Sequence, residues 1–540
     1  MSKHAGTLIQ SILSAAGINK VWGITGDSAN YITAAICKND IRFMHVRHEE
    51  SGGFAAGTES LITGKLTACI GSCGPGALHF INGLYDANKN GASVLCIATQ
   101  IPSYEIGTKY IQETDPKELF RDCSVFCEYI NDTKQIPRIM GLAMQNAISK
   151  KGVAVIIIPG DISSESIPSE FNTKYIPHYT NPVRVTPESD IDMIADIINE
   201  SDSIGILYGG SCDKSMKELK EISEKIKAPI AWNLFGRAIS YNSTYNGGCA
   251  DNFCDTYDED IVKKSDLIII TGMKDFPDSV ANTNAKVIRI GNNIIDNSQK
   301  IHADYIIEGN EYEIFSALKD KIKHKTGLGF AEGIARKHKS DKQSFELEAS
   351  VKSDSKGVIR PEYLFSLLNN IIPDNAIITS DIGTSALLTG IYICPKPGRS
   401  FYQSSVYGSI GNSLPMSLGA AAANTGKKVI AICGDGGISM LLGEMITLNQ
   451  MNLDVKVIIL NNSGYEYTGY INKNNPIGED MPTLTDFSKV AQSFGLESKQ
   501  VVDADNLEVV LKEWIDSDKA NVLEVKTAHL NNPSLFFKQI

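Results

Sequence analysis

The sequence predicts an α/β protein built from three domains, each a mostly parallel sheet flanked by helices. Short apolar runs alternate with amphipathic segments along the whole chain, which is the pattern of strands and helices in βαβ units. The length of 540 residues exceeds what a single hydrophobic core usually organises, so we expect about three domains. The expected strands are residues 21–24, 66–71, 94–99, 153–158, 204–208, 230–233, 267–271, 286–290, 376–380, 429–433, 455–460 and 522–525.

Two segments divide the chain into these domains. Three prolines in residues 175–187 favour an extended connector. Residues 326–358 are rich in charge and poor in apolar periodicity, which indicates an exposed linker with one helix. We therefore expect a first domain at residues 1–180, a central domain at 188–325, the linker at 326–358 and a third domain at 359–530.

Composition argues against several classes of partner. The formal net charge is −12 and no stretch clusters Lys and Arg with aromatic residues, so a nucleic-acid partner is not expected. No apolar run reaches the roughly 18 residues of a membrane span, and residues 535–540 lack the apolar face of an interfacial helix. The 11 cysteines show no metal-ligand spacing and are expected to be reduced core residues. We expect a cytoplasmic protein without a stable membrane anchor.

The strongest chemical pattern lies in the third domain. The expected strand at 429–433 ends in a turn with Gly434, Gly436 and Gly437, which opens a helix whose free N–H groups suit a phosphate. Asp435 lies in this turn and the next strand ends at Asn462, so both side chains are expected at the carboxyl edge of one parallel sheet. A carboxylate, an amide oxygen and a backbone carbonyl suit the octahedral preference of Mg²⁺. The alternative is a glycine turn with two capping amides.

Gly-Asp-Gly, a spacer of this length and then Asn-Asn resembles the signature of thiamine diphosphate enzymes of the pyruvate oxidase, acetolactate synthase and pyruvate decarboxylase group. The resemblance implies that Asp435 and Asn462 bind Mg²⁺ through their side chains and Gly464 through its main-chain carbonyl. It also implies that Tyr465 contacts the cofactor. In this family the three domains are, in order, pyrimidine-binding, central with a Rossmann-like fold, and diphosphate-binding.

A second match is Arg47-His48-Glu49, directly before a helix rich in small residues. It resembles the family's Arg-His-Glu segment, which gives Glu49 the catalytic role. The chemistry needs a carboxylic acid against N1′ of the aminopyrimidine, because sharing that proton lets the 4′-imino tautomer remove the hydrogen from the thiazolium C2. On its own, this segment would be interpreted as a solvated charge cluster.

Two further segments of the third domain resemble cofactor contacts of the family. Residues 408–415 resemble the loop that binds the aminopyrimidine through its backbone, with Gly408 and Ser409 in the loop and Ile410 as the apolar wedge beneath the cofactor. Residues 381–385 resemble a second diphosphate contact, formed by Asp381, Gly383 and Thr384, with Thr384 giving the hydrogen bond. The alternatives are an ordinary buried isoleucine and an ordinary helix cap after a strand.

The most detailed likeness lies in the first domain, at residues 22–28, 47–50, 71–90, 101–120 and 158–161. These segments resemble bacterial quinone-dependent pyruvate dehydrogenase and the related phosphate-dependent pyruvate oxidases. This resemblance implies that Asp27, His79 and Gln112 line the substrate side of the cofactor, with His79 donating a hydrogen bond to the 2-oxo acid. A lone histidine among apolar residues is more often structural. Residues 107–113 lack the adjacent His pair of pyruvate decarboxylases, and Ile111 stands where oxidases and synthases usually have Phe.

The central domain leaves FAD open. Flavin-binding relatives carry a glycine-rich stretch where this chain has residues 247–253, and an acidic strand end where it has residues 288–293 without Asp. The Phe-Pro pair at 276–277 does match the flavin-binding pattern. FAD is therefore a possible third cofactor beside thiamine diphosphate and Mg²⁺.

Three functions follow from these patterns. The first is decarboxylation of a small 2-oxo acid such as pyruvate with electron transfer to FAD, and the second is an acetolactate synthase-like carboligase or decarboxylase without functional flavin. The third is a non-catalytic binding subunit, against which the retention of Glu49, Asp435 and Asn462 argues. In this family Glu49 and Asp435 are not expected to serve one cofactor within one chain. We therefore expect a homodimer or homotetramer with cofactor sites between subunits.

Overall fold

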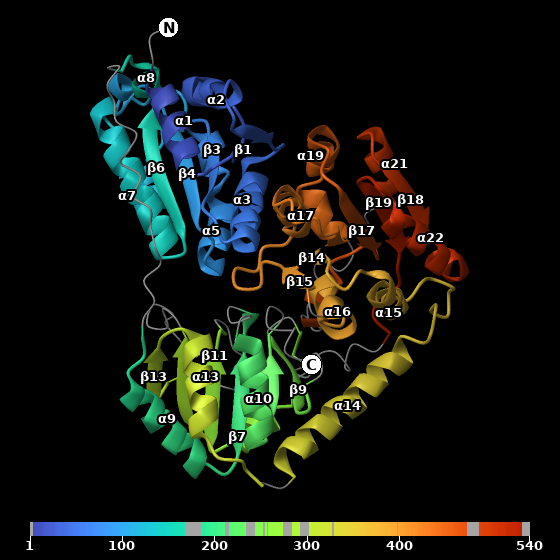
Figure 1. Cartoon of the computed structure of the whole chain (residues 1–540). Helices are drawn as coiled ribbons and strands as arrows, with labels where there is room; N and C mark the ends of the chain where they lie inside the picture. The colour runs from blue at the N-terminus through green and yellow to red at the C-terminus, as the bar shows by residue number, and fades with distance from the viewer. Residues whose placement is uncertain are drawn as a thin grey trace.

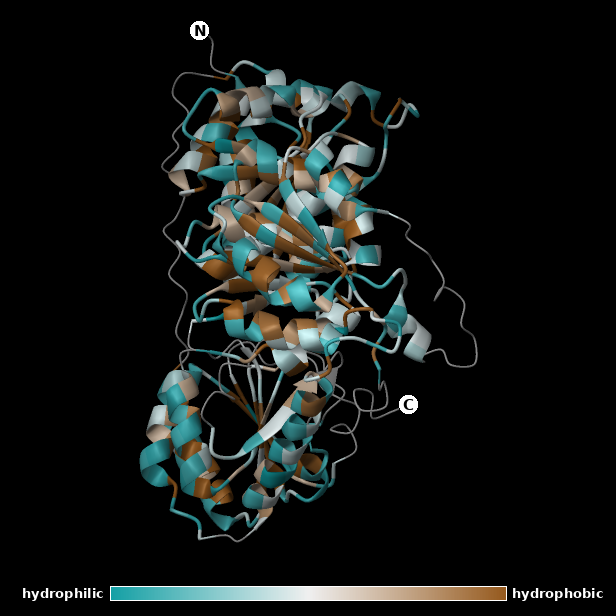
Figure 2. Ribbon diagram, turned by 90° about the vertical axis from the view of Figure 1, so that its right-hand side faces the viewer, coloured by the Kyte–Doolittle hydropathy of each residue, from teal (hydrophilic) through white to brown (hydrophobic). Residues whose placement is uncertain are grey.

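The computed structural model contains three sheets, each in its own domain (Figure 1). It describes residues 4–167, 185–210, 215–233, 243–251, 254–255, 258–273, 283–291, 302–326, 329–396, 398–471 and 485–531. Apolar strands lie between helices whose polar residues face outward (Figure 2). Within the described ranges, no helix is both long and apolar enough to cross a bilayer.

The first sheet is parallel, in the order β2-β1-β3-β4-β6-β5. Its strands are β1 (Lys20–Gly23), β2 (Arg42–His45), β3 (Thr67–Gly71), β4 (Val94–Gln100), β5 (Phe126–Tyr129) and β6 (Val153–Pro159). Its helices are α1 (Ala5–Ala15), α2 (Asn30–Cys37), α3 (Glu49–Thr63), α4 (Pro75–Leu78), α5 (Ile81–Asn90), α6 (Pro116–Phe120), α7 (Ile136–Ser149) and α8 (Gly160–Ser164), with short 3₁₀ turns at Asp27–Ala29, Ser103–Glu105 and Thr133–Gln135. Apolar clusters fill both faces, one beneath α1, α2 and α7 and one beneath α3 and α5.

The central sheet has the order β10-β9-β8-β7-β11-β12-β13, parallel except for the β9–β10 pair. Its strands are β7 (Ile204–Tyr208), β8 (Ile230–Trp232), β9 (Asn246–Asp251), β10 (Cys254–Asp255), β11 (Leu267–Thr271), β12 (Lys286–Gly291) and β13 (Tyr305–Glu308). Its helices are α9 (Glu188–Glu200), α10 (Met216–Ile226), α11 (Asp260–Lys263) and α13 (Glu311–Lys321). The long helix α14 (Phe330–Glu348) then leads to the third domain (Figure 1).

The third sheet is parallel, in the order β15-β14-β16-β17-β19-β18. Its strands are β14 (Ile377–Ser380), β15 (Ser400–Tyr402), β16 (Val429–Gly434), β17 (Val455–Asn461), β18 (Glu497–Val501) and β19 (Asn521–Lys526). Its helices are α15 (Pro361–Ile371), α16 (Thr384–Tyr392), α17 (Ser413–Ala422), α18 (Asp435–Met440), α19 (Glu444–Met451), α20 (Glu466–Ile471), α21 (Phe487–Ser493) and α22 (Ala504–Asp516).

Helices α3 and α17 join the first domain to the third within the same chain. Small residues let the two backbones approach closely, because a Cβ on Gly419 would lie 2.1 Å from the carbonyl oxygen of Ala55. Buried residues of both helices, including Ala55 and Leu418, belong to one apolar cluster. The contact brings the start of α3, at Glu49, to the third domain.

Candidate active site

The residues predicted to bind Mg²⁺ lie at the carboxyl edge of the third sheet. β16 and β17 are parallel neighbours, and Asp435 and Asn462 directly follow their carboxyl ends. Asp435 Oδ1 accepts a hydrogen bond from the Gly436 N–H at 2.8 Å, and Asn462 Oδ1 accepts one from the Gly464 N–H at 3.1 Å. A Cβ on Gly436 would lie 2.4 Å from the ring of Tyr465, so the contact between these two loops requires glycine.

Asp381 holds three loops of this edge together. It follows β14, is fully buried, and accepts hydrogen bonds from the N–H groups of Gly411 at 2.7 Å and Ile382 at 3.1 Å. A Cβ on Gly437 would lie 1.8 Å from its carboxylate. Burial raises the pKa of Asp381 to about 7, and hydrogen bonds from backbone N–H groups, first that of Gly411, oppose this shift. The carboxylate therefore supports the loops around the predicted cofactor site.

The start of α16 lies beside the same loops. Gly383 caps this helix with a φ of 105°, a conformation that side chains rarely adopt. The next residue, Thr384, shares a hydrogen bond with the carboxylate of Glu466 on α20. Thr384 is thus fixed at the first turn of α16, where the sequence predicts the diphosphate.

The loop expected to bind the aminopyrimidine is closed by Ser404. The Ser404 carbonyl accepts from the Gly408 N–H at 2.6 Å, and its hydroxyl accepts from the Ser409 N–H at 3.0 Å. Gly408 has a φ of 83°, in the left-handed region. Ile410 follows, half-buried, between this turn and the Asp381 contact.

Glu49 is buried at the start of α3, with 9% of its side chain exposed. Its Oε2 atom lies 3.0 Å from Nδ1 of His79, whose ring stacks on His48 at a centroid distance of 4.6 Å. The carboxylate of Glu444, at the start of α19, accepts hydrogen bonds from the N–H groups of Arg47 at 2.9 Å and His48 at 3.0 Å. The third domain therefore fixes the backbone that presents Glu49.

Asn82 links the Glu49 end of the site to the aminopyrimidine loop. Its amide nitrogen donates to the carboxylate of Glu50 and to Ser409 Oγ, the second at 2.9 Å. The small residues of α3 and α17 bring the start of α3 to the third domain within the chain. That Glu49 and Asp435 do not serve one cofactor within one chain stays a prediction. A homodimer or homotetramer stays a prediction.

The other two residues expected on the substrate side are exposed. Asp27 lies in a 3₁₀ turn, and its neighbour Ser28 accepts a hydrogen bond from the Cys73 N–H at 2.8 Å. Gln112 adopts a φ of 64° and accepts a hydrogen bond from the Cys73 thiol at 3.2 Å. A Cβ on Gly74 would lie 2.8 Å from the Cβ of Gln112, so this loop packs directly on the turn after β3.

Sequence reasoning missed several residues that organise the site. Glu444, Asn82 and Ser28 act through long-range contacts that leave no local pattern. Glu466 could have been found from the sequence, because it is an acidic residue only four positions after the predicted metal ligand Asn462. Its carboxylate is buried and accepts a hydrogen bond from the Asn462 amide at 3.0 Å.

The residues present fit thiamine diphosphate with Mg²⁺. Asp435, Asn462 and the Gly464 carbonyl offer hard oxygen ligands at one sheet edge, as Mg²⁺ prefers. A Cβ on Gly434 would meet only Ser385 Oγ, at 3.6 Å, which leaves this position open toward a bulky anion. Among the described residues, no group of three His, Cys, Asp or Glu side chains could hold a metal ion.

Comparison with known proteins gives the same assignment for all three domains. Residues 3–119 match the family description "Thiamine pyrophosphate enzyme, N-terminal TPP binding domain", residues 191–318 match the central domain, and residues 381–525 match the C-terminal TPP binding domain.

Several relatives are similar over nearly the whole chain. A putative thiamine pyrophosphate-containing protein, YdaP of Bacillus subtilis, is 27% identical over 99% of this chain and 93% of its own. A probable acetolactate synthase large subunit of Methanococcus aeolicus is 27% identical over 95% of this chain and 90% of its own. Pyruvate oxidase of Lactiplantibacillus plantarum is 24% identical over 94% and 86%. This chain therefore belongs to the thiamine pyrophosphate enzyme family, in the group that contains the pyruvate oxidases and acetolactate synthases.

Proposed function

We propose that this protein removes CO₂ from a small 2-oxo acid such as pyruvate, using thiamine diphosphate and Mg²⁺. The observation that carries the proposal is the buried carboxylate of Glu49, which lies 3.0 Å from His79 and is linked through Asn82 to the loop at Ser409. One acid, one imidazole and a backbone loop thus converge from two domains. The named relatives include pyruvate oxidase.

The cofactor would lie along the carboxyl edge of the third sheet. Asp435, Asn462 and the Gly464 carbonyl would hold Mg²⁺, and the glycine turn at 434–437 with the start of α16 would meet the diphosphate. The loop at 408–410 would hold the aminopyrimidine against Glu49. When bound, thiamine diphosphate supplies the electron sink for loss of CO₂.

Glu49 and His79 would carry out the proton transfers. Glu49 would hold a proton at the ring nitrogen N1′, and its burial keeps water from competing for that contact. His79 lies on the open side of Glu49 with 47% of its side chain exposed, so its ring reaches both the carboxylate and an incoming 2-oxo acid. Its contact with Glu49 and its stacking on His48 orient the imidazole for donation to the substrate.

The next step separates two candidate reactions. Transfer of electrons to FAD is supported by the likeness of the first domain to the pyruvate oxidases. Formation of a C–C bond is supported by the acetolactate synthase relatives and by the lack of an acidic residue at 288–293, where flavin-binding relatives carry one. The flavin-pattern residues 252–253, 276–277 and 292–293 lie outside the described residues.

One experiment tests both the decarboxylation and the step that follows it. Purified protein is given thiamine diphosphate, Mg²⁺ and pyruvate, and CO₂ release, visible absorption and products are measured. CO₂ with a bound flavin spectrum and acetate or acetyl phosphate supports the oxidase reaction. CO₂ from a colourless protein with an acetolactate-type product supports carboligation. No CO₂ from pyruvate or from a panel of other 2-oxo acids contradicts the proposal.

A further inference from the structure

Glu466 is a buried carboxylate at the start of α20 that the proposed reaction does not use. Its Oε2 atom accepts a hydrogen bond from Asn462 Nδ2 at 3.0 Å. Its Oε1 atom accepts one from the Tyr470 hydroxyl at 2.6 Å and one from the Leu530 N–H. The hydroxyl of Thr384 also hydrogen-bonds to this carboxylate. Glu466 thus touches one predicted Mg²⁺ ligand and one predicted diphosphate contact.

The contacts of Glu466 fix the orientation of the Asn462 amide. A carboxylate only accepts hydrogen bonds, so the Asn462 side chain must turn its nitrogen toward Glu466 and its oxygen away. An amide oxygen has two lone pairs, and the Gly464 N–H occupies one of them. The second lone pair could bind the metal ion of the proposed function.

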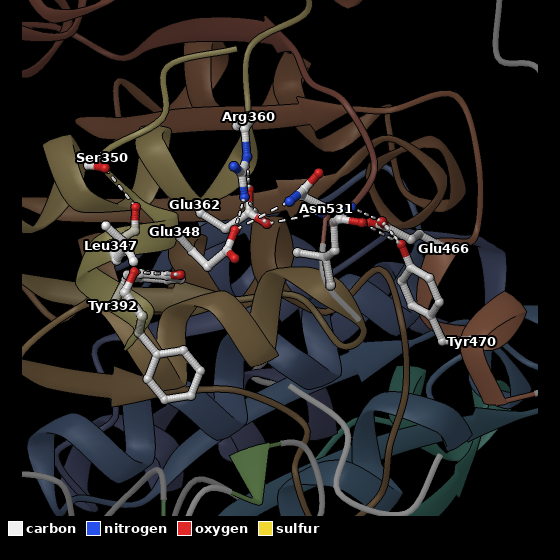
Figure 3. A network of polar contacts seen from close by, with 11 residues as sticks. Leu347, Glu348, Ser350, Arg360, Glu362, Tyr392, Glu466, Tyr470 and Asn531 are labelled. Carbon is white, nitrogen blue, oxygen red and sulfur yellow. Dashed lines mark hydrogen bonds and ion pairs between the residues drawn. The ribbon is translucent and has the colours of Figure 1, made fainter. Parts of the chain in front are cut away.

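Glu466 is itself held by a wider polar network (Figure 3). Asn531, next to Leu530, donates its N–H to Glu362 Oε1 at 3.2 Å. Arg360 makes ion pairs with Glu362 and with Glu348 at the end of α14. The segment at 530–531 is therefore tied both to Glu466 and to the helix that enters the third domain. This gives Glu466 a fixed position from which to orient Asn462.

We propose that Glu466 is the positioning residue of the Mg²⁺ site, acting through Asn462. This inference rests on the proposed function, since it assumes that Asn462 binds the metal of thiamine diphosphate. Partners of metal ligands commonly contribute 10–100-fold to metal affinity because they orient the ligand. A substitution at Glu466 should therefore act on Mg²⁺ affinity, and less on the stability of the cofactor-free fold.

The test is Glu466→Gln, which keeps the size of the side chain. It replaces one carboxylate oxygen with an NH₂ group that cannot accept a hydrogen bond from the surrounding donors. The two donors to Oε1 favour keeping oxygen there, so the new NH₂ faces the Asn462 nitrogen and turns the amide away from the metal side. Titration calorimetry with thiamine diphosphate at a series of Mg²⁺ concentrations should show that the variant needs about 10–100-fold more Mg²⁺ for half-saturation.

Glu362→Gln is the matched control, because Glu362 is a buried acid without contact to Asn462 and the amide oxygen of Gln can still accept the hydrogen bond from the Asn531 N–H that holds the segment at 530–531. It should keep the wild-type Mg²⁺ requirement even where its unfolding midpoint falls. An unchanged Mg²⁺ requirement in Glu466→Gln overturns the inference, as does an equal rise in both variants. If Glu466→Gln does not fold, Glu466→Asp, which withdraws the carboxylate by one methylene, must show the same rise. Failure of the wild-type protein to bind thiamine diphosphate at any Mg²⁺ concentration instead refutes the proposed function.

Discussion

Asp86 makes the stability of this protein depend on pH. It lies on α5, only 3% exposed, and hydrogen-bonds to Ser404 and Asn90. Among the described residues, its Oδ1 atom has no hydrogen-bond partner. Burial raises the pKa of Asp86 from 3.8 to about 7, and the two hydrogen bonds oppose this rise. The folded protein therefore binds a proton here more tightly than the unfolded chain does.

The size of the effect follows from this shift. Raising the pKa of Asp86 by about 3 corresponds to about 4 kcal/mol of folding free energy, because each tenfold change in proton affinity is worth about 1.36 kcal/mol. The stabilisation by the neutral acid is complete below pH 3.8, the ordinary value, and is lost as the pH rises through about 7. Asp86→Asn is neutral at every pH and can keep the contacts to Ser404 and Asn90. The variant should match the wild type near pH 3.8 and be more stable, by up to about 4 kcal/mol, at pH 8.

The assay is guanidinium unfolding of both proteins at a series of pH values. Tyr407 faces Asp86 and stacks on Tyr85. Burial and the charge of Asp86 raise the pKa of Tyr407, so this tyrosine stays neutral in the folded protein at pH 8, where the two proteins are compared. Asp40→Asn, at an exposed aspartate, is the matched control. Equal pH slopes in wild type and Asp86→Asn would refute the reasoning.

Two further substitutions test the geometry of the site. In Gly437→Ala the new Cβ would lie 1.8 Å from the Asp381 carboxylate, so the loops must shift and turnover should fall by about 10²-fold; unchanged steady-state kinetics would contradict the packing described here. His79→Gln removes the imidazole from Glu49 and should lower kcat/KM for the 2-oxo acid by about 10²-fold while calorimetry shows unchanged affinity for thiamine diphosphate. A loss of cofactor affinity instead would show that His79 is structural.

The interior strands except β9 were predictable from the sequence, and the edge strands were not. The expected strands at 204–208 and 267–271 coincide with β7 and β11, because strands buried on both faces are continuous apolar runs. The edge strands β5, β15 and β18 were missed. They have exposed or half-buried residues, and β18, Glu-Ser-Lys-Gln-Val, carries mostly polar side chains. A short polar strand gives no alternation or apolar run to detect.

The candidate site also has one part that the sequence predicts and one part that it does not. Asp435 and Asn462 follow strand ends in the sequence, so their common sheet edge could be predicted from the order of elements. The contact of Glu49 with His79 was not predicted, because Glu49 begins α3 and His79 lies between α4 and α5, far apart in the sequence. The roles of Glu444 and Asn82 depend on tertiary contacts across domains, and these have no counterpart in local spacing.

The most direct test of the central claim is the rate at which the C2 hydrogen of bound thiamine diphosphate exchanges with deuterium, measured by NMR after acid quench. Wild-type protein with Mg²⁺ should accelerate this exchange over the free cofactor, because Glu49 shares the proton of N1′. In Glu49→Gln the exchange should slow by about 10²–10⁴-fold while calorimetry shows the cofactor still bound. Equal exchange in the wild type and the variant would contradict the account.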